Sequence, residues 1–426
     1  MTPIEDHPER YRLANELHAR PFPAVNSPAT VVFVAIKQAS EAVSRDRGLD
    51  RAHLTALLDR FGVAHPAPGA THYSGQIGRH TLKWEQHTEF VTYTAITDGI
   101  STRPFDPVDF DVFPADWLAQ APGVRITSAL LRIAEHPGEA EVLSALNDWF
   151  VPEGLAVAQV LDRAATVAAD YRIDTSGHQR IAIFVADGTG QRRVGRIVQR
   201  VIEVETYKSM SMLGFSRARD LSGRIADLDD QLSALMQEMT DGAGPPEDTL
   251  QQLLAISAEL ETMAARSSFR FGATGAYAAL VGQRIGALRE TRFGGRQIFS
   301  EFMMRRFEPA MRTVTSTQTR LQALADRALR AGNLLRTQVD VERSAQNQAL
   351  LASMDRRADL QLRLQHTVEG LSVVAISYYA VSLVGYLLYP LTMALGISKG
   401  MLIAGITLPV IAGVWWAVRR IRKKLD

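Results

Sequence analysis

Four residues among the last 50 of the chain have the types and spacing of a polar helix face. Tyr378, Ser382, Gly385 and Tyr389 recur at steps of four, three and four residues, so a helix would place three hydroxyl groups and a glycine on one side. The surrounding sequence is apolar, and hydroxyl groups on such a helix either line a water-filled path or bond a neighbouring helix. Both interpretations are open, and the first makes these residues a candidate ion pathway.

A second candidate group lies in the first hundred residues. Glu85, His87 and Glu89 alternate, so an extended chain would offer two carboxylates and an imidazole to a divalent ion on one face. However, HTLKWEQ and EFVTYTAI read as two closely joined strands, and a turn near His87 would break the alternation. The competing interpretation is that the three residues lie on a hairpin face exposed to solvent. The sequence therefore does not identify the residues that would bind a metal ion.

The conventional signatures of enzymes are missing from the sequence. With no cysteine, thiolate zinc sites, iron–sulfur clusters and cysteine nucleophiles are excluded. Asp187-Gly-Thr-Gly190 lacks the lysine of a P-loop and the third glycine of a dinucleotide fingerprint, so it predicts a plain turn before a helix. The balance of 47 basic and 46 acidic residues gives no basic field for nucleic acid. We expect no enzyme, no cofactor and no nucleic-acid partner.

The elements that must position the candidate residues divide by hydrophobic period. Region 1–189 mixes strands and helices, which predicts an α+β (mixed α/β) domain. Helices are predicted over 50–61 and 138–150, and strands over 31–36, 80–86, 89–96, 124–134, 164–173 and 179–187. The sequence Asp174-Thr-Ser-Gly177 predicts a hairpin turn between the last two strands.

Region 190–369 has only helical period. We predict one helix over 191–240, a second from the break at 241–248 to about Arg292, and a third from Gln297, with a kink or new first turn at Pro309. The first two would form a hairpin and the third a stalk. Small residues at four-residue steps predict close helix packing (Ala278, Gly282, Gly286). An apolar seam on the stalk predicts self-association, and therefore a homo-oligomer (Val314, Leu321, Leu324, Ala328, Ala331, Leu335).

Region 370–418 predicts two transmembrane helices. Gly370–Ser398 and Gly400–Val418 contain no formal charge, and about 20 apolar residues cross a bilayer as a helix. Small residues on the second predict helix packing (Gly405, Pro409, Gly413). The tail 419–426 carries five basic residues, whereas the loop between the spans carries Lys399 alone. The positive-inside rule therefore places both termini in the cytoplasm, with the spans in the lipid bilayer of a bacterial inner membrane.

Several long strings resemble a known family. HPERYRLANELHARPFPAV, LKWEQHTEF, ETYKSMSMLGFSRAR and VDVERSAQNQALLASMDRRADLQLRLQHTVEGLSVVAISYY are similar to the bacterial family of uncharacterised membrane-anchored proteins known as domain of unknown function 3422. The resemblance covers nearly the whole chain, and it implies membrane anchoring but no particular activity.

The predicted architecture also resembles the CorA-type metal-ion transporters. In that group, a cytoplasmic α/β domain precedes a helical hairpin with an acidic tip, a long stalk, two spans and a basic tail. Here the hairpin tip carries seven acidic residues (Asp227, Asp229, Asp230, Glu238, Asp241, Glu247, Asp248). The resemblance implies a homo-oligomer, in those transporters a pentamer whose first span lines the pore. The Gly-Met-Asn tripeptide that ends their first span is absent from 387–400, and Lys399 would repel cations at the mouth.

Two functions of different classes therefore follow from the sequence. The first is an inner-membrane homo-oligomer of CorA-like build that transports an ion, with a cytoplasmic domain that senses a ligand. The second is a membrane-anchored scaffold or sensor that transports nothing and binds a cytoplasmic partner. The ion, its direction and the regulatory ligand cannot be derived from the sequence.

Overall fold

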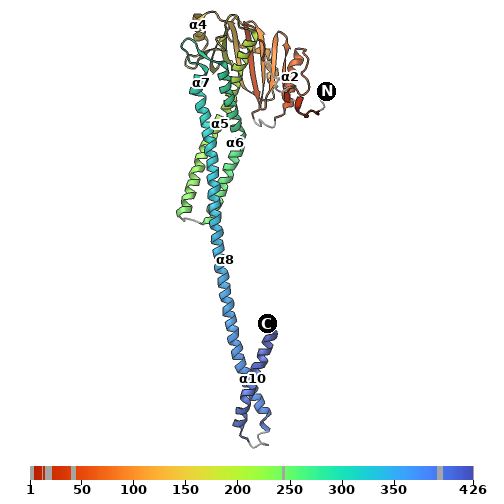
Figure 1. The fold of residues 1–426 in the computed structure, drawn as a ribbon, viewed down its shortest axis with the longest axis vertical. Helices are drawn as coiled ribbons and strands as arrows, with labels where there is room; N and C mark the ends of the chain where they lie inside the picture. The colour runs from red at the N-terminus through yellow and green to blue at the C-terminus, as the bar shows by residue number, and fades with distance from the viewer. Residues whose placement is uncertain are drawn as a thin grey trace. The chain divides into compact units, whose positions relative to one another are not determined.

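The computed structural model describes residues 4–11, 13–14, 22–39, 45–241, 245–390 and 397–425. The chain forms two compact units, Met1–Ala243 with Gln251–Ala331 and Gly244–Leu250 with Gly332–Asp426. The first unit contains a nine-stranded sheet with helices on both faces (Figure 1). The predicted loop between the two membrane spans falls largely on residues 391–396, which lie outside the described residues.

The sheet has the order β2-β3-β4-β1-β5-β8-β7-β6-β9. Strands β5 and β8 are parallel, and the other described pairs of neighbouring strands in the sheet are antiparallel. Its strands are β1 Ala29–Lys37, β2 His72–Ile77, β3 His80–Gln86, β4 Phe90–Asp98, β5 Val124–Glu135, β6 Ala156–Val160, β7 Ala165–Ile173, β8 Gln179–Val185 and β9 Thr291–Arg292. This arrangement confirms the mixed α+β class and both predicted hairpins.

Two apolar cores lie on opposite faces of the sheet. On one face, alternate strand residues such as Val32 and Trp84 pack against leucines of α2 and against Trp117. On the other face, residues such as Phe33 and Ile183 pack against α5, α6 and α7. The helices are α2 Arg47–Arg60, η1 Pro107–Val112, α3 Ala115–Leu118, α4 Glu139–Trp149, α5 Gln191–Asp241, α6 Pro246–Leu288, α7 Phe299–Arg306, α8 Glu308–Leu387 and α10 Lys399–Leu425.

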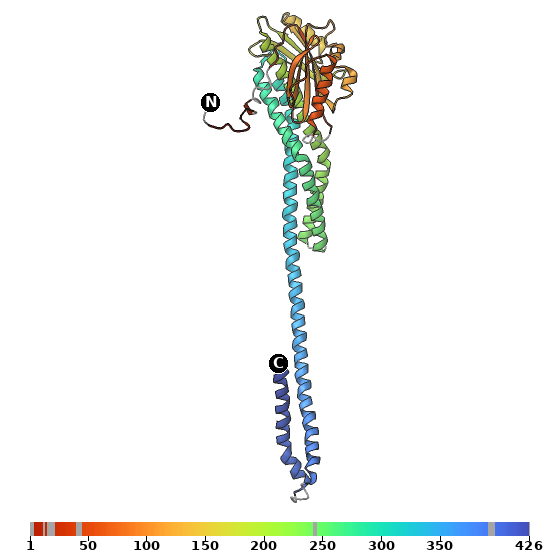
Figure 2. The ribbon, with the colours of Figure 1, turned by 90° about the vertical axis from the view of Figure 1, so that its right-hand side faces the viewer.

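Helices α5, α6 and the first part of α8 form a bundle within the first unit (Figures 1 and 2). Gly214 of α5 is required there, because a Cβ atom at this position would lie 2.0 Å from Thr274 Oγ1 of α6. Pro309 occupies the first turn of α8, where its missing N–H costs nothing.

The predicted apolar seam of the stalk is buried within this single chain. Its six residues, Val314 to Leu335, are between 1% and 4% exposed. Arg320 and Arg327 of α8 both pair with Asp229 of α5, at 3.0 and 3.2 Å. The prediction that this seam binds helices of other subunits is therefore wrong, because helices of the same chain already cover it. The acidic hairpin tip is also partly neutralised by these arginines.

Helix α6 ends at Leu288, earlier than predicted. Arg289 has a left-handed φ of 49°, which stops the helix, and Thr291–Arg292 adds strand β9 to the edge of β6. The carboxylate of Glu290 then accepts hydrogen bonds from the backbone N–H groups of Phe299 and Ser300 at the start of α7. No strand is predictable at these residues, because a two-residue strand has no detectable period.

The second unit contains a hairpin of α10 and the last part of α8 (Figure 2). The two helices are in contact, since a Cβ atom at Gly385 would lie 3.8 Å from Ile403 Cγ1 and 3.9 Å from Ile406 Cδ1. Both helices are long and apolar enough to cross a membrane by length and composition. Their apolar windows are 6% and 0% buried, unlike core helices of a soluble protein.

Candidate functional site

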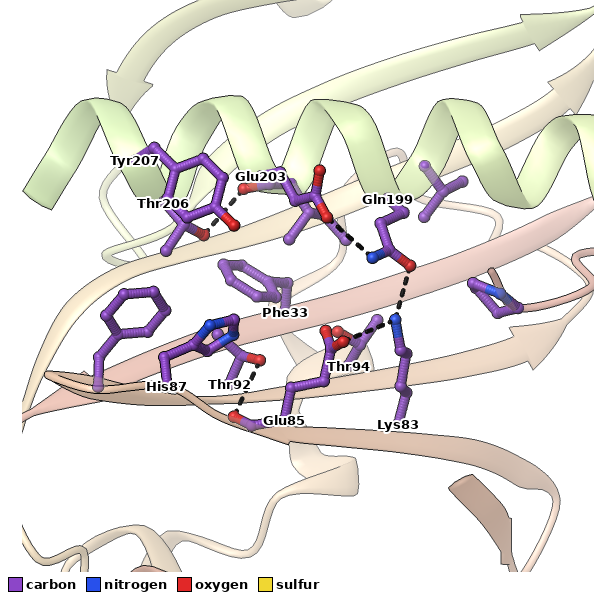
Figure 3. Close-up of a pocket in the computed structure, with 14 residues that line it drawn as sticks. Phe33, Lys83, Glu85, His87, Thr92, Thr94, Gln199, Glu203, Thr206 and Tyr207 are labelled. Atoms are coloured by element: carbon purple, nitrogen blue, oxygen red, sulfur yellow. Dashed lines mark hydrogen bonds and ion pairs between the residues drawn. The ribbon is translucent and has the colours of Figure 1, made fainter. Parts of the chain in front are cut away.

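A polar cleft lies between α5 and the sheet (Figure 3). The alternation of β3 sends Leu82 and Trp84 into one core and sends Lys83 and Glu85 to the other face. A strand with this pattern normally turns its polar side to water, but α5 covers it here. Polar residues consequently face each other across the cleft (Lys83, Glu85, His87, Thr92 and Thr94 from the sheet; Gln199, Glu203 and Thr206 from α5).

The polar groups of the cleft form a connected chain. The ammonium of Lys83 donates to Gln199 Oε1 at 2.6 Å and lies 3.2 Å from Glu85 Oε1. The amide of Gln199 donates to Glu203 Oε1 at 2.9 Å, and Glu203 also pairs with Arg284 of α6. Two cations therefore balance two carboxylates, which is the condition for keeping charges at a largely buried site.

The other end of the cleft is aromatic. The rings of His87 and Phe90 stack with centroids 4.4 Å apart, and Tyr207 stacks on Tyr277 at 5.8 Å. Burial, together with the nearby carboxylate of Glu89, raises the pKa of Tyr277 well above its usual value, so its hydroxyl stays protonated. The cavity volume is about 30 Å³, which is room for a water molecule or a small ion.

The turn between β3 and β4 is fixed from beneath by Arg45. This buried guanidinium donates to the carbonyls of His87, Thr88 and Phe90 and pairs with Asp50. Four interactions from one side chain hold the turn in a single conformation. The position of His87 at the mouth of the cleft follows from that clamp.

The three residues considered as metal ligands are separated by this turn. Glu85 and His87 both line the cleft, but Glu89 is buried and pairs with Arg270 of α6. The interpretation as a solvated hairpin face is therefore wrong for Glu89. Among the described residues, no group of three or more His, Asp or Glu side chains is placed to hold a metal ion.

Three residues of the predicted ion pathway, Tyr378, Ser382 and Gly385, lie on one stripe of α8, whereas Tyr389 follows the end of this helix at Leu387. Tyr378 is exposed, and the Ser382 hydroxyl donates to the Tyr378 carbonyl at 3.0 Å. Gly385 faces α10 of the same chain, and the Lys399 ammonium lies 5.8 Å from the Tyr389 ring centroid. The structure thus places the first three residues together on α8 and covers their stripe partly at Gly385.

Two further predictions about small residues have different outcomes. The turn Asp187–Gly190 is a turn before α5, as predicted, with Thr189 bonded to the Ala164 carbonyl. A Cβ atom added at Gly282 or Gly286 of α6 would have no other atom within 4 Å. The prediction of close helix packing at these two positions is therefore wrong for the single chain. These two glycines line an open groove of about 420 Å³ beside Met303 of α7 and Phe307, which follows that helix. The face of α10 at Gly405 and Gly413 is similarly open.

Sequence reasoning missed most of the cleft. Lys83, Gln199 and Glu203 were not singled out, because lysine and glutamate on an alternating strand or a helix are usually solvated. One available signal was that Lys83 and Glu85 alternate with Leu82 and Trp84 on β3, while the helix opposite carries Gln199 and Glu203 among valines and isoleucines.

Comparison with known families now places the chain. The family model described as protein of unknown function (DUF3422) matches residues 5–425. The protein belongs to this family. No curated protein matches the sequence significantly. Membership agrees with the resemblance seen in the sequence and assigns no activity to the cleft or to the apolar helices.

Proposed function

We propose that this member of the DUF3422 family is an inner-membrane homo-oligomer of CorA-like build that transports an ion under control of its cytoplasmic domain. The observation that carries the proposal is the continuity of α8. The helix runs for 80 residues from Glu308 to Leu387 without a break, and Met311 near its start packs against the core beneath the sheet. Its other end contains the first of the two apolar windows. One helix thus connects a folded domain to a candidate membrane span.

The proposed topology rests on charge. The last turns of α10 are basic, whereas Lys399 at its start is the one charge between the apolar segments, so we assign both termini to the cytoplasm. Trp415 and Trp416 precede the basic tail, where indole rings favour the membrane interface, and Arg419 and Arg420 lie over these rings at 4.9 and 5.2 Å. A reporter fused after Asp426 should be active in the cytoplasm, which checks this assignment.

In this proposal the polar cleft is where the cytoplasmic domain senses its ligand. Its two layers belong to different elements, since Lys83 and Glu85 come from β3 whereas Gln199 and Glu203 come from α5. A ligand that replaces the Lys83–Gln199 bond would change the contact between the sheet and α5. The small volume favours an ion or another water-sized ligand over an organic molecule.

A second function, a membrane-anchored scaffold or sensor, is favoured by a specific observation. The hydroxyl of Ser382 is bonded to its own helix and Gly385 contacts α10, which are the arrangements expected of helix packing. In this alternative the hydroxyl stripe binds a neighbouring helix, and the cytoplasmic domain binds a partner.

Ion flux from liposomes that contain the purified protein separates the two functions. Under the transport proposal, wild-type protein releases an ion above the level of empty liposomes, and Ser382→Leu closes the path by placing an apolar group at its middle. Ser372→Leu is a matched control, because Ser372 makes the same bond to the carbonyl four residues earlier but lies on another face. Loss of flux with the assembly intact in Ser382→Leu alone supports transport. If wild-type protein carries none of the cations and anions tried, the transport proposal fails and the scaffold replaces it.

A further inference from the structure

A stripe of eight residues continues the hydroxyl face of α8 far beyond the apolar window. The spacing is four, three, four, three, four, four and three residues, and at 100° per residue all eight fall within an arc of about 80°. We call this set the α8 stripe; it carries no charged residue (Leu360, Leu364, Thr367, Leu371, Val374, Tyr378, Ser382, Gly385).

The large side chains of the α8 stripe are exposed in the single chain. Leu360, Leu364, Leu371, Val374 and Tyr378 are between 64% and 71% exposed. Helix α10 touches the stripe at Gly385, where a Cβ atom would lie 3.8 Å from Ile403 Cγ1, and Val418 of α10 lines a groove beside Leu364. Contact with α10 therefore leaves most of the stripe available to another molecule.

The position of the stripe along α8 identifies its occupant. It starts at Leu360, between the charged residues Asp359 and Arg363, and continues through the uncharged segment that begins at Gly370. Lipid can cover only the uncharged part, and a soluble protein can cover only the part before it. A partner that covers the whole stripe must make a contact about 38 Å long and must pass from polar to apolar surroundings at the same level as α8 does. A parallel copy of α8 has this profile by construction.

We propose that the α8 stripe is the surface through which copies of this chain associate, with their α8 helices parallel and in register. The inference rests on the membrane insertion and assembly in the proposed function, but not on ion flux. It also moves the subunit contact from the Val314–Leu335 seam, which is already covered, to the part of α8 that follows. Copies arranged in this way bring the Tyr378 and Ser382 positions of neighbouring subunits together inside the membrane.

Disulfide crosslinking tests the arrangement directly, because the natural chain contains no cysteine. In parallel helices that are in register, residue 364 of one copy lies beside residue 364 of the next. The Leu364→Cys variant of the full-length protein in membranes should therefore form covalent dimers on mild oxidation. Leu362→Cys is the matched control, since Leu362 is also an exposed leucine but lies about 160° around the helix from Leu364. Crosslinking should be at least about tenfold faster at 364, because a disulfide needs Cα atoms within about 7 Å.

A second pair extends the test into the apolar window. Tyr378→Cys on the stripe should crosslink, and its exposed neighbour Tyr379→Cys should not. Both leucine variants change exposed side chains, so a single chain should fold normally, which circular dichroism checks. Equal crosslinking at 362 and 364, or none at 364 and 378, would overturn the inference. Crosslinking at 364 and 378 in a protein that carries no ion would leave the inference standing and reject the transport proposal.

Discussion

Two parts of one helix, α8, have the same apolar period and different surroundings. In the seam from Val314 to Leu335, the side chains are almost completely buried against helices of the same chain, whereas the α8 stripe from Leu360 is exposed. Steps of three and four residues predict that a helix face will be covered, but not by which molecule. The difference arises from chain length, because the α5–α6 hairpin can cover only the part of α8 that it reaches.

The sharpest way to break this comparison is to place a charge in each part. Leu321→Lys puts an ammonium at a position 2% exposed, where burial of an unpaired charge should cost about 3–5 kcal/mol and lower the melting temperature strongly. Leu364→Lys lies on an exposed face, so it should leave the melting temperature nearly unchanged but reduce the mass of the oligomer in detergent. Differential scanning fluorimetry and light scattering measure the two effects.

Leu362→Lys is the control for both variants and should change neither quantity. The opposite pattern, with a loss of mass in Leu321→Lys at an unchanged melting temperature, would mean that the seam is the subunit contact after all. The distinction between the two parts of α8 would then be wrong.

The comparison of the two parts of α8 also explains which features could be predicted from the sequence. Elements with strong local signals were predicted, such as β1 from Val31–Ile36, the hairpin of β3 and β4, and the helix start near Gln191. The short strands β2, β6 and β9 were missed, because they lack a clear period and exist through pairing with neighbours distant in sequence. Partners of the seam were missed for a related reason, since periodicity carries no information about the covering molecule.

The candidate site divides in the same way. The stripe residues Tyr378, Ser382 and Gly385 were recognised because their spacing lies within one helix. The cleft depends on residues more than 100 positions apart, such as Lys83 and Gln199, which only the packing of α5 on the sheet brings together. Of the three residues considered as metal ligands, Glu85 and His87 line the cleft, whereas Glu89 forms an ion pair with Arg270 of α6.

A change of pH sharpens the comparison, because it acts on the sheet and not on the α8 stripe. Burial, then the charge of Arg125, lowers the pKa of His178 from 6.5 to about 4, and its ring lies 2.9 Å from the Ser128 hydroxyl. The unfolded chain therefore binds a proton at a higher pH than the folded chain does. Stability should be complete above pH 6.5 and fall as the pH drops toward 4, by about 2–3 kcal/mol.

Chemical denaturation at a series of pH values measures this loss. His178→Gln cannot be protonated and should remove that part of the profile, whereas His65→Gln, at an exposed position, should leave it. The mass of the wild-type oligomer in detergent should persist at pH 5, because the α8 stripe contains no group that titrates there. If His178→Gln lost as much stability at acid pH as the wild-type protein does, the effect would belong to other residues.

The smallest expected effect concerns what fixes α8 on α5. Asp229 pairs with both Arg320 and Arg327, and all three side chains are about one-third to one-half exposed. Such pairs usually contribute little, so Asp229→Asn should cost about 0.5–1 kcal/mol, which thermal unfolding can resolve. Asp359→Asn is the counterpart in the later part of α8, where Asp359 pairs only with the exposed Arg363 of its own helix, and it should have no measurable effect. If Asp229→Asn cost several times more, the arginines rather than the apolar seam would determine the packing of α8. Burial at Val314–Leu335 would then be a consequence of that ion-pair network and not its cause.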